Sequence, residues 1–248
     1  METINTNKQF LLTQEEIATR IYLVNNKLYK LVKVYDEPDY EQEYKDFIEL
    51  MSFLSRDLLF YELVKPIDLV RCQEYDRKRM GYTMEYLDKH YSFATALNLE
   101  SLQTKKEYFK RVAAILKRIK EYGMAYDDIH GENILVHKFT DEIKFIDPDS
   151  LKIEGINTED ISKYELREKL HFTQLMLSAI YDTDMSFNYY YKMSDKLKGL
   201  QVSKEMMDYI KSIEGDVTPS EYITDFKQDF EPDVVRFNKK ITDRRRMF

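Results

Sequence analysis

The chain has 248 residues, of which 43% are hydrophobic and 14% aromatic, so it can bury a sizeable core and is not a disordered polymer. A formal net charge of −7 argues against a general nucleic-acid-binding protein, because such proteins usually carry a basic surface. The single cysteine excludes an intrachain disulfide, no apolar run approaches the roughly 20 residues of a membrane span, and residues 1–14 lack the pattern of a signal peptide. We therefore expect a cytoplasmic globular protein without membrane or nucleic-acid partners.

A β-hairpin is predicted close to the N-terminus. Apolar, β-branched and aromatic residues fill 21–24 and 28–35, and the polar turn 25–27 separates them. Because side chains alternate between the two faces of a strand, Lys30 lies on one face with apolar neighbours, whereas Lys33 lies on the other. An ordinary role as solvated strand residues stays open for both lysines.

One helix and two more strands follow. Apolar residues recur at helical spacing over 39–54, directly after the start signal Pro38-Asp39. Residues 64–70 and 80–87 are rich in apolar and β-branched side chains, which is typical of strands. The first third of the chain is therefore predicted to be a small β-sheet with one helix.

The rest of the chain is predicted to be mainly helical. We divide the α+β chain into a strand-rich part, 1–87, and a helical part, 88–248, which together form one domain. A ligand cleft is expected where the two parts meet, because ligand sites favour such junctions. Apolar stripes of helical period predict helices over 105–122, 164–181, 203–213 and 220–230.

Three oxygen-bearing side chains in the middle of the chain indicate a metal-binding and catalytic site. Asp128 and Asn133 lie five residues apart on a turn that leads into an apolar strand, and Asp147 follows fourteen residues after Asn133 at the end of another. Mg²⁺ prefers oxygen ligands and commonly takes only one or two from the protein. We predict Asn133 and Asp147 as those ligands, which leaves Asp128 to orient or deprotonate an attacking hydroxyl. Taken singly, Asp128 and Asn133 could also serve as local turn residues.

This stretch resembles the catalytic loop and the metal-binding segment of the protein-kinase-like fold. Against the pattern H-R-D-L-x-x-x-N, Tyr126 and Asp127 replace the His and the Arg, whereas Asp128 and Asn133 match the Asp and the Asn. Asp147 stands where the Asp of D-F-G would be. The resemblance implies a two-lobed α+β fold, with a small antiparallel β-sheet lobe that carries one helix and a mainly helical second lobe. It also implies ATP and Mg²⁺ as cofactors.

In that family a strand lysine contacts the α- and β-phosphates of the nucleotide, and a glutamate on the following helix holds the lysine. The resemblance assigns the lysine to Lys30, with Lys33 as the alternative. It assigns the glutamate to Glu43, with Glu41 and Glu49 as alternatives, because Glu43 lies at the margin of the apolar face of the helix.

The resemblance also assigns main-chain contacts with the adenine edge to Glu85 and Leu87.

The chain departs from the family in three further places. No glycine occurs before Gly81, so the phosphate-covering glycine loop is missing. Asp147-Pro148-Asp149 replaces D-F-G, and Asp149 could bind a second metal or cap the next loop. His130 stands where Ser/Thr kinases carry Lys. In the D-P-D sequence and in His130, the chain resembles the aminoglycoside and other small-molecule phosphotransferases that share the fold.

The first functional hypothesis is an ATP- and Mg²⁺-dependent phosphotransferase with Asp128, Lys30 and Asn133 as catalytic residues. The acceptor would be a hydroxyl of a protein Ser or Thr, of the protein itself, or of a small molecule. Only about sixteen residues separate Asp147 from the helix predicted at 164, which argues against a switchable activation loop. A pseudokinase, acting as a nucleotide-binding or interaction module, and a protein that transfers AMP are the alternatives.

Overall fold

The structure, a computed structural model, describes residues 2–3, 19–33, 40–56, 61–74, 77–182, 193–198, 200 and 202–214. These residues fall into two compact units. Unit 1 takes its described residues from Met1–Tyr91 and Leu135–Glu159, and unit 2 from Ser92–Ile134 and Asp160–Phe248. Lys30 and Asp147 therefore belong to unit 1, whereas Asp128 and Asn133 belong to unit 2.

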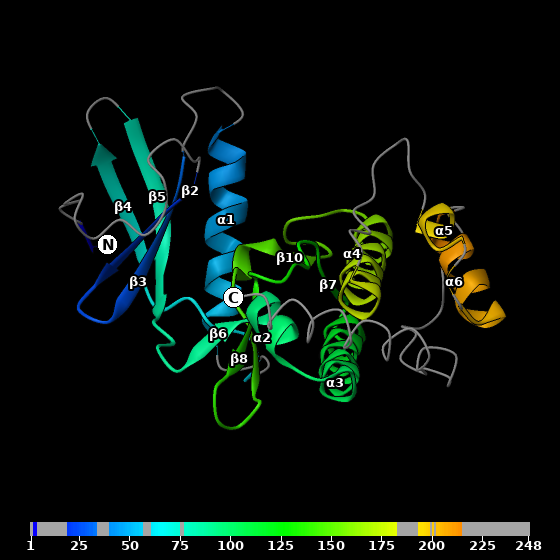
Figure 1. The fold of residues 1–248 in the computed structure, drawn as a ribbon. Helices are drawn as coiled ribbons and strands as arrows, with labels where there is room; N and C mark the ends of the chain where they lie inside the picture. The colour runs from blue at the N-terminus through cyan, green and yellow to red at the C-terminus, as the bar shows by residue number, and fades with distance from the viewer. Residues whose placement is uncertain are drawn as a thin grey trace. The chain divides into compact units, whose positions relative to one another are not determined.

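A five-stranded sheet forms a large part of unit 1 (Figure 1). Its strands are β1 (Glu2–Thr3), β2 (Thr19–Val24), β3 (Lys27–Lys33), β4 (Leu69–Glu74) and β5 (Arg77–Glu85). The spatial order is β1-β4-β5-β3-β2, and all neighbouring pairs are antiparallel except β1 with β4. Asn25 and Asn26 form the turn between β2 and β3, with φ of 51° and 62°. A two-residue hairpin turn of this kind needs positive φ at both positions, and asparagine adopts positive φ more readily than most residues.

The predicted strand over 64–70 is wrong in its first part, because β4 begins only at Leu69. Pro66 lacks the N–H group that a strand ladder needs, so the chain before β4 makes isolated hydrogen bonds instead. The N–H of Val64 donates to the carbonyl of Phe145 at 2.8 Å, and the N–H of Ile67 donates to the carbonyl of Thr83 at 2.7 Å. By contrast β5 starts at Arg77, earlier than predicted. The apolar pattern did not indicate this start, because the first three residues of β5 are charged.

The helix α1 (Tyr40–Leu54) matches the prediction for 39–54 and lies alongside the sheet in Figure 1. The ring of Phe47 lies 6.3 Å from the ring of Tyr82 on β5. Tyr82 is the direct cross-strand partner of Lys30, so both side chains lie on one face of the sheet. The apolar stripe of α1 is buried at Leu50, Met51 and Leu54.

The opposite face of the sheet carries a second apolar cluster. It consists of four buried side chains, with Val24 packed against them: Tyr22, Tyr29, Leu31 and Val70. Gly81 of β5 lies between Leu31 and Val70 in the strand register. A Cβ atom at Gly81 would lie only 1.8 Å from the carbonyl oxygen of Lys30, so this close approach of β3 and β5 requires glycine.

A second sheet carries the apolar strands predicted around the motif. It consists of β6 (His90–Ser92), β8 (Ile134–His137) and β9 (Ile143–Phe145), in the order β6-β8-β9. Alternate residues of β8 and β9 are buried, as expected for strands with one face in a core. The one-turn 3₁₀ helix η2 (Pro148–Ser150) and the strand β10 (Leu151–Ile153) follow β9, and α1 packs against η2.

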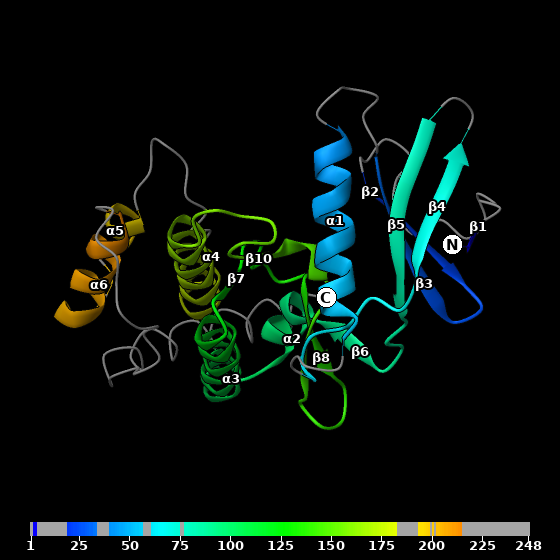
Figure 2. The ribbon, with the colours of Figure 1, turned by 180° about the vertical axis from the view of Figure 1, so that it is seen from behind.

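Unit 2 is mainly helical. It contains α2 (Phe93–Leu99), α3 (Leu102–Glu121), β7 (Met124–Tyr126), α4 (Ser162–Tyr181), α5 (Met193–Lys196) and α6 (Lys204–Glu214). The hydroxyl of Ser101 caps α3 by accepting the N–H of Thr104 at 3.2 Å, and Gly123 with φ of 69° follows the end of the helix. α3 and α4 run side by side in Figures 1 and 2 and pack against each other.

The predicted class is confirmed at the level of an α+β protein with small, mainly antiparallel sheets and six described α-helices. The two-lobed kinase-like arrangement and the division at residue 87 stay predictions. None of the helices in the described ranges combines the length and the apolar character needed to cross a membrane. The predicted helix over 220–230 and the strand end at 34–35 lie outside the described residues.

Candidate functional site

Lys30 lies in the middle of β3 and is buried, with 7% of the residue exposed. Its ammonium group lies 5.9 Å from the centre of the Tyr82 ring. A buried cation needs an anionic partner, because desolvation otherwise destabilises its charge. Two carboxylates of unit 1 supply that partner.

Asp147 reaches Lys30 because the chain turns sharply after β9. Asp147 has φ of 69° and ψ of 54°, a left-handed conformation that Asp tolerates better than most residues. Pro148 favours this turn, because its fixed φ suits the first position of η2 and its ring disfavours a right-handed helical conformation at the preceding residue. The hydroxyl of Ser150 donates to Oδ2 of Asp147 at 2.7 Å, which orients the carboxylate.

The Nζ atom of Lys30 forms ion pairs with both aspartates of the turn. It contacts Oδ1 of Asp147, and it lies 2.8 and 3.0 Å from the two carboxylate oxygens of Asp149. The hydroxyl of Tyr82 donates to Oδ1 of Asp149 at 2.5 Å. One ammonium thus faces two carboxylates, so the group carries surplus negative charge. We call Lys30, Tyr82, Asp147, Asp149 and Ser150 the Lys30 cluster.

A second group lies on the loop of unit 2 that connects β7 to β8. The side-chain nitrogen of Asn133 donates to the main-chain oxygen and to Oδ2 of Asp128, both at 3.1 Å. Because both partners only accept, the amide nitrogen must face Asp128, and the amide oxygen is the atom that can bind a cation. Nε2 of His130 lies 3.4 Å from the same Oδ2, and its Nδ1 accepts the N–H of Glu132 at 3.2 Å.

The two donors share one oxygen of Asp128, and this decides what its carboxylate can do. Oδ2 is occupied, so among the described residues Oδ1 is left for an incoming hydroxyl. The hydrogen bond from His130, followed by smaller contributions that include Asn133, lowers the pKa of the Asp128 carboxyl. Asp128 is therefore ionised at neutral pH, and a carboxylate of lowered pKa suits orientation of a hydroxyl better than early proton abstraction.

The helix α4 holds the chain just before this loop group. Oε2 of the Glu168 carboxyl group accepts the main-chain N–H of Tyr126 at 2.5 Å. Nε of Arg167 lies 3.2 Å from Oδ1 of Asp127, and Nδ1 of His171 lies 3.1 Å from the Asp127 carbonyl. Sequence reasoning missed these three anchors. For the buried Glu168, a charged residue within the apolar stripe of α4 is a signal that could have indicated its role.

The contact between Glu168 and Tyr126 can be tested by the pH dependence of stability. The side chain is 1% exposed, and burial raises its pKa from 4.5 to about 8. Because the folded protein holds this proton more tightly than the unfolded chain, its contribution to stability is complete below pH 4.5 and is lost as the pH rises through about 8. We expect the free energy of unfolding to fall by on the order of 3 kcal/mol between pH 5 and pH 8, measured by urea denaturation.

Glu168→Gln is the matched control, because glutamine keeps an acceptor for the N–H of Tyr126 but cannot ionise. The variant is expected to lose most of this pH dependence. An equal pH dependence in both proteins would show that Glu168 does not carry it.

The remaining predicted residues belong to unit 1. The side chains of Glu43, Glu41 and Lys33 lie outside the described residues, and Glu49 is exposed. Glu85 is exposed at the end of β5; Leu87 is partly buried, and its carbonyl accepts the N–H of His90 at 3.1 Å. The adenine contacts assigned to Glu85 and Leu87 stay predictions. Both residues line a pocket of about 280 Å³ together with Tyr61, Leu63, Val64, Lys65, Ile67 and Lys144.

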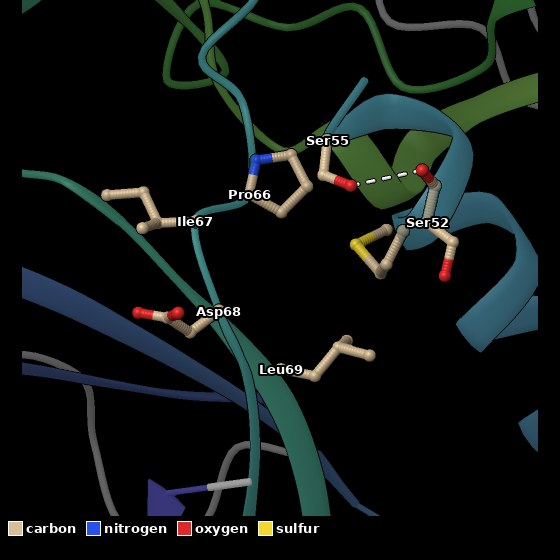
Figure 3. Close-up of a pocket in the computed structure, with 7 residues that line it drawn as sticks. Ser52, Ser55, Pro66, Ile67, Asp68 and Leu69 are labelled. Carbon is tan, nitrogen blue, oxygen red and sulfur yellow. Dashed lines mark hydrogen bonds between the residues drawn. The ribbon is translucent and has the colours of Figure 1, made fainter.

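A pocket of about 700 Å³ opens between the end of α1 and the chain that enters β4 (Figure 3). Its lining contains none of the predicted site residues. Two of its polar side chains are engaged in local contacts: the hydroxyl of Ser55 donates to the carbonyl of Ser52 at 3.0 Å, and Asp68 accepts a hydrogen bond from Lys27 at 2.8 Å. We assign no chemistry to this pocket.

The donor atoms of the two groups fit magnesium better than a softer metal. Over the described ranges, no three His, Cys, Asp or Glu side chains are arranged to hold a metal ion. Mg²⁺ needs fewer protein ligands, since water and phosphate complete its octahedron, and carboxylate and amide oxygens suit it. Asn133 and Asp147 belong to different units, so their convergence on one ion stays a prediction.

Comparison with known proteins adds no family to this description. No protein-family model matches the chain, and no curated protein matches its sequence. The function has to be argued from the two groups of residues themselves.

Proposed function

We propose that the protein is a phosphotransferase that uses ATP and Mg²⁺ and transfers the γ-phosphoryl group to a hydroxyl. The observation that supports this best is the Lys30 cluster, in which a buried strand lysine is paired with Asp147, at the position of the D-F-G aspartate. A purely structural ion pair would need only one carboxylate. The surplus negative charge of the cluster favours a cation beside it.

Each side chain has a distinct part in this proposal. Lys30 binds the phosphates of the nucleotide, and Asp147 and Asn133 hold Mg²⁺ through their oxygen atoms. The ion supplies charge neutralisation when it is bound. Asp128 orients the acceptor hydroxyl through Oδ1 and accepts its proton late in the transfer, and catalysis rests mainly on positioning.

The test combines binding and turnover. Thermal unfolding is measured with ATP, with and without Mg²⁺, and release of phosphate to water and the intact mass are followed after incubation with ATP. We expect stabilisation that depends on Mg²⁺, together with slow release of phosphate or an added phosphate group. Asp128→Asn, which keeps the shape of the side chain, should retain the stabilisation and lose about 10²- to 10⁴-fold in turnover. Equal turnover in the variant would exclude Asp128 as the catalytic residue.

A pseudokinase is the second candidate function. Two observations favour it: Lys30 is already engaged by Asp147 and Asp149, and no glycine precedes Gly81 to let the backbone approach a phosphate. Stabilisation by ATP without any transfer would support this candidate, whereas an added adenylate in the mass spectrum would indicate AMP transfer.

A further inference from the structure

The Lys30 cluster identifies a partner for the lysine other than the expected helix glutamate. The sequence assigned this role to Glu43, whose side chain lies outside the described residues. Among the described residues, Asp149 approaches Lys30 with both carboxylate oxygens, at 2.8 and 3.0 Å. A two-oxygen contact with a charged donor is among the stronger hydrogen-bonding arrangements in proteins.

We propose that Asp149 is the positioning residue for Lys30, and that it holds the ammonium group ready for the phosphates of a nucleotide. The consequence for nucleotide binding rests on the proposed function. The contacts themselves lie within unit 1 and come from β3, β5 and η2.

Asp149 is itself held in place before any ligand binds. The hydroxyl of Tyr82 donates to its Oδ1 at 2.5 Å, and Tyr82 is completely buried against Phe47 of α1. Side-chain exposure is 8% for Lys30 and 20% for Asp149, so solvent screens this pair less than a surface pair. A positioning residue needs such support, because a loosely held carboxylate could not fix the lysine.

In this proposal the two aspartates of the turn have different roles, Asp147 as a metal ligand and Asp149 as the partner of Lys30. Asp147 and Asp149 both reach Lys30 because the left-handed conformation at Asp147 and the 3₁₀ turn of η2 bring residues two apart to the same side. If Asp147 releases the lysine to bind Mg²⁺, Asp149 still neutralises and orients the ammonium. This role gives the second aspartate of D-P-D a function within unit 1.

The experiment compares Asp149→Asn with Glu43→Gln, two substitutions that each remove one charge and keep the shape. The affinity for Mg²⁺ with a non-hydrolysable ATP analogue is measured by calorimetry, and KM for ATP and kcat are measured where turnover is detectable. We expect Asp149→Asn to weaken analogue binding and to raise KM about tenfold or more, and to do both by a larger factor than Glu43→Gln. Asp149→Glu, which keeps the charge, should restore part of the affinity.

The outcomes separate this inference from the proposed function. Binding without transfer, weakened by Asp149→Asn, would support the role of Asp149 and reject the phosphotransferase. Transfer that Asp149→Asn leaves unchanged, or that Glu43→Gln impairs more strongly, would reject the role of Asp149 and keep the enzyme. A wild-type protein that binds no nucleotide would overturn both, because Lys30 would have no phosphate to meet.

Discussion

Asp147→Asn is expected to reduce Mg²⁺-dependent phosphoryl transfer by about 10²- to 10³-fold, the size typical of removing one preorganised electrostatic contact. Asparagine removes the charge that Mg²⁺ needs but tolerates the left-handed φ of 69° at this position. Lys30 keeps Asp149 as its partner, so the buried ammonium is not left without an anion. The measurement is the initial rate of transfer against Mg²⁺ concentration, together with thermal unfolding to show that the fold is retained.

Asp141→Asn is a matched control for this variant. Asp141 lies in the same unit, is exposed and also has a left-handed backbone, with φ of 56°. The same chemical change there should leave the rate within about twofold, because a substitution on an exposed turn away from the site has a small effect. Full activity of Asp147→Asn would remove Asp147 from the site and with it the metal assignment.

Gly81→Ala is expected to lower the free energy of unfolding of unit 1 by about 2 kcal/mol or more, because it forces an atom into a packed backbone. The added Cβ would lie 1.8 Å from the carbonyl oxygen of Lys30, so β3 and β5 must separate. That movement displaces the Lys30 side chain from Asp149, and nucleotide binding should weaken in parallel. Urea denaturation and calorimetry with the ATP analogue measure the two effects.

Gly155→Ala separates this clash from the general effect of replacing glycine. Gly155 has φ of 79°, and a Cβ there would meet no atom within 4 Å. Its substitution should lower stability by about 1 kcal/mol through backbone strain alone and should leave nucleotide affinity unchanged. A loss of affinity as large as that of Gly81→Ala would contradict the special position of Gly81.

Local patterns predicted most of the regular structure. Asn25-Asn26 between two alternating segments indicated the hairpin, and apolar periodicity placed α1, α3, α4 and α6 within three residues of their observed ends. α2 and β7 were not predicted, because segments of seven and three residues are too short to show a period. The strand expected over 64–70 started too early because its apolar residues concealed the effect of Pro66.

In the candidate site, too, contacts between residues close in sequence could be predicted, whereas contacts that depend on packing could not. Asp128 and Asn133 could be paired from the sequence because five residues of one loop separate them, and the structure joins them through the amide of Asn133. Lys30 could be preferred to Lys33 from strand alternation. The anchoring of the loop by Glu168 could not be predicted, because it depends on how α4 packs against β7.

By itself the sequence determined the longer helices, the hairpin turn and the loop that carries Asp128, since each depends on neighbouring residues and on the backbone preferences of Asn, Pro and Gly. Only the tertiary structure decided which carboxylates meet the lysine. Lys30, Tyr82 and Asp149 come from separate parts of the chain, and the register of β3 with β5 and the turn after β9 bring them together. A contact that depends on tertiary packing has no characteristic spacing in the sequence. For this reason the sequence did not predict Asp149 as a carboxylate that holds Lys30, and the role was assigned to Glu43.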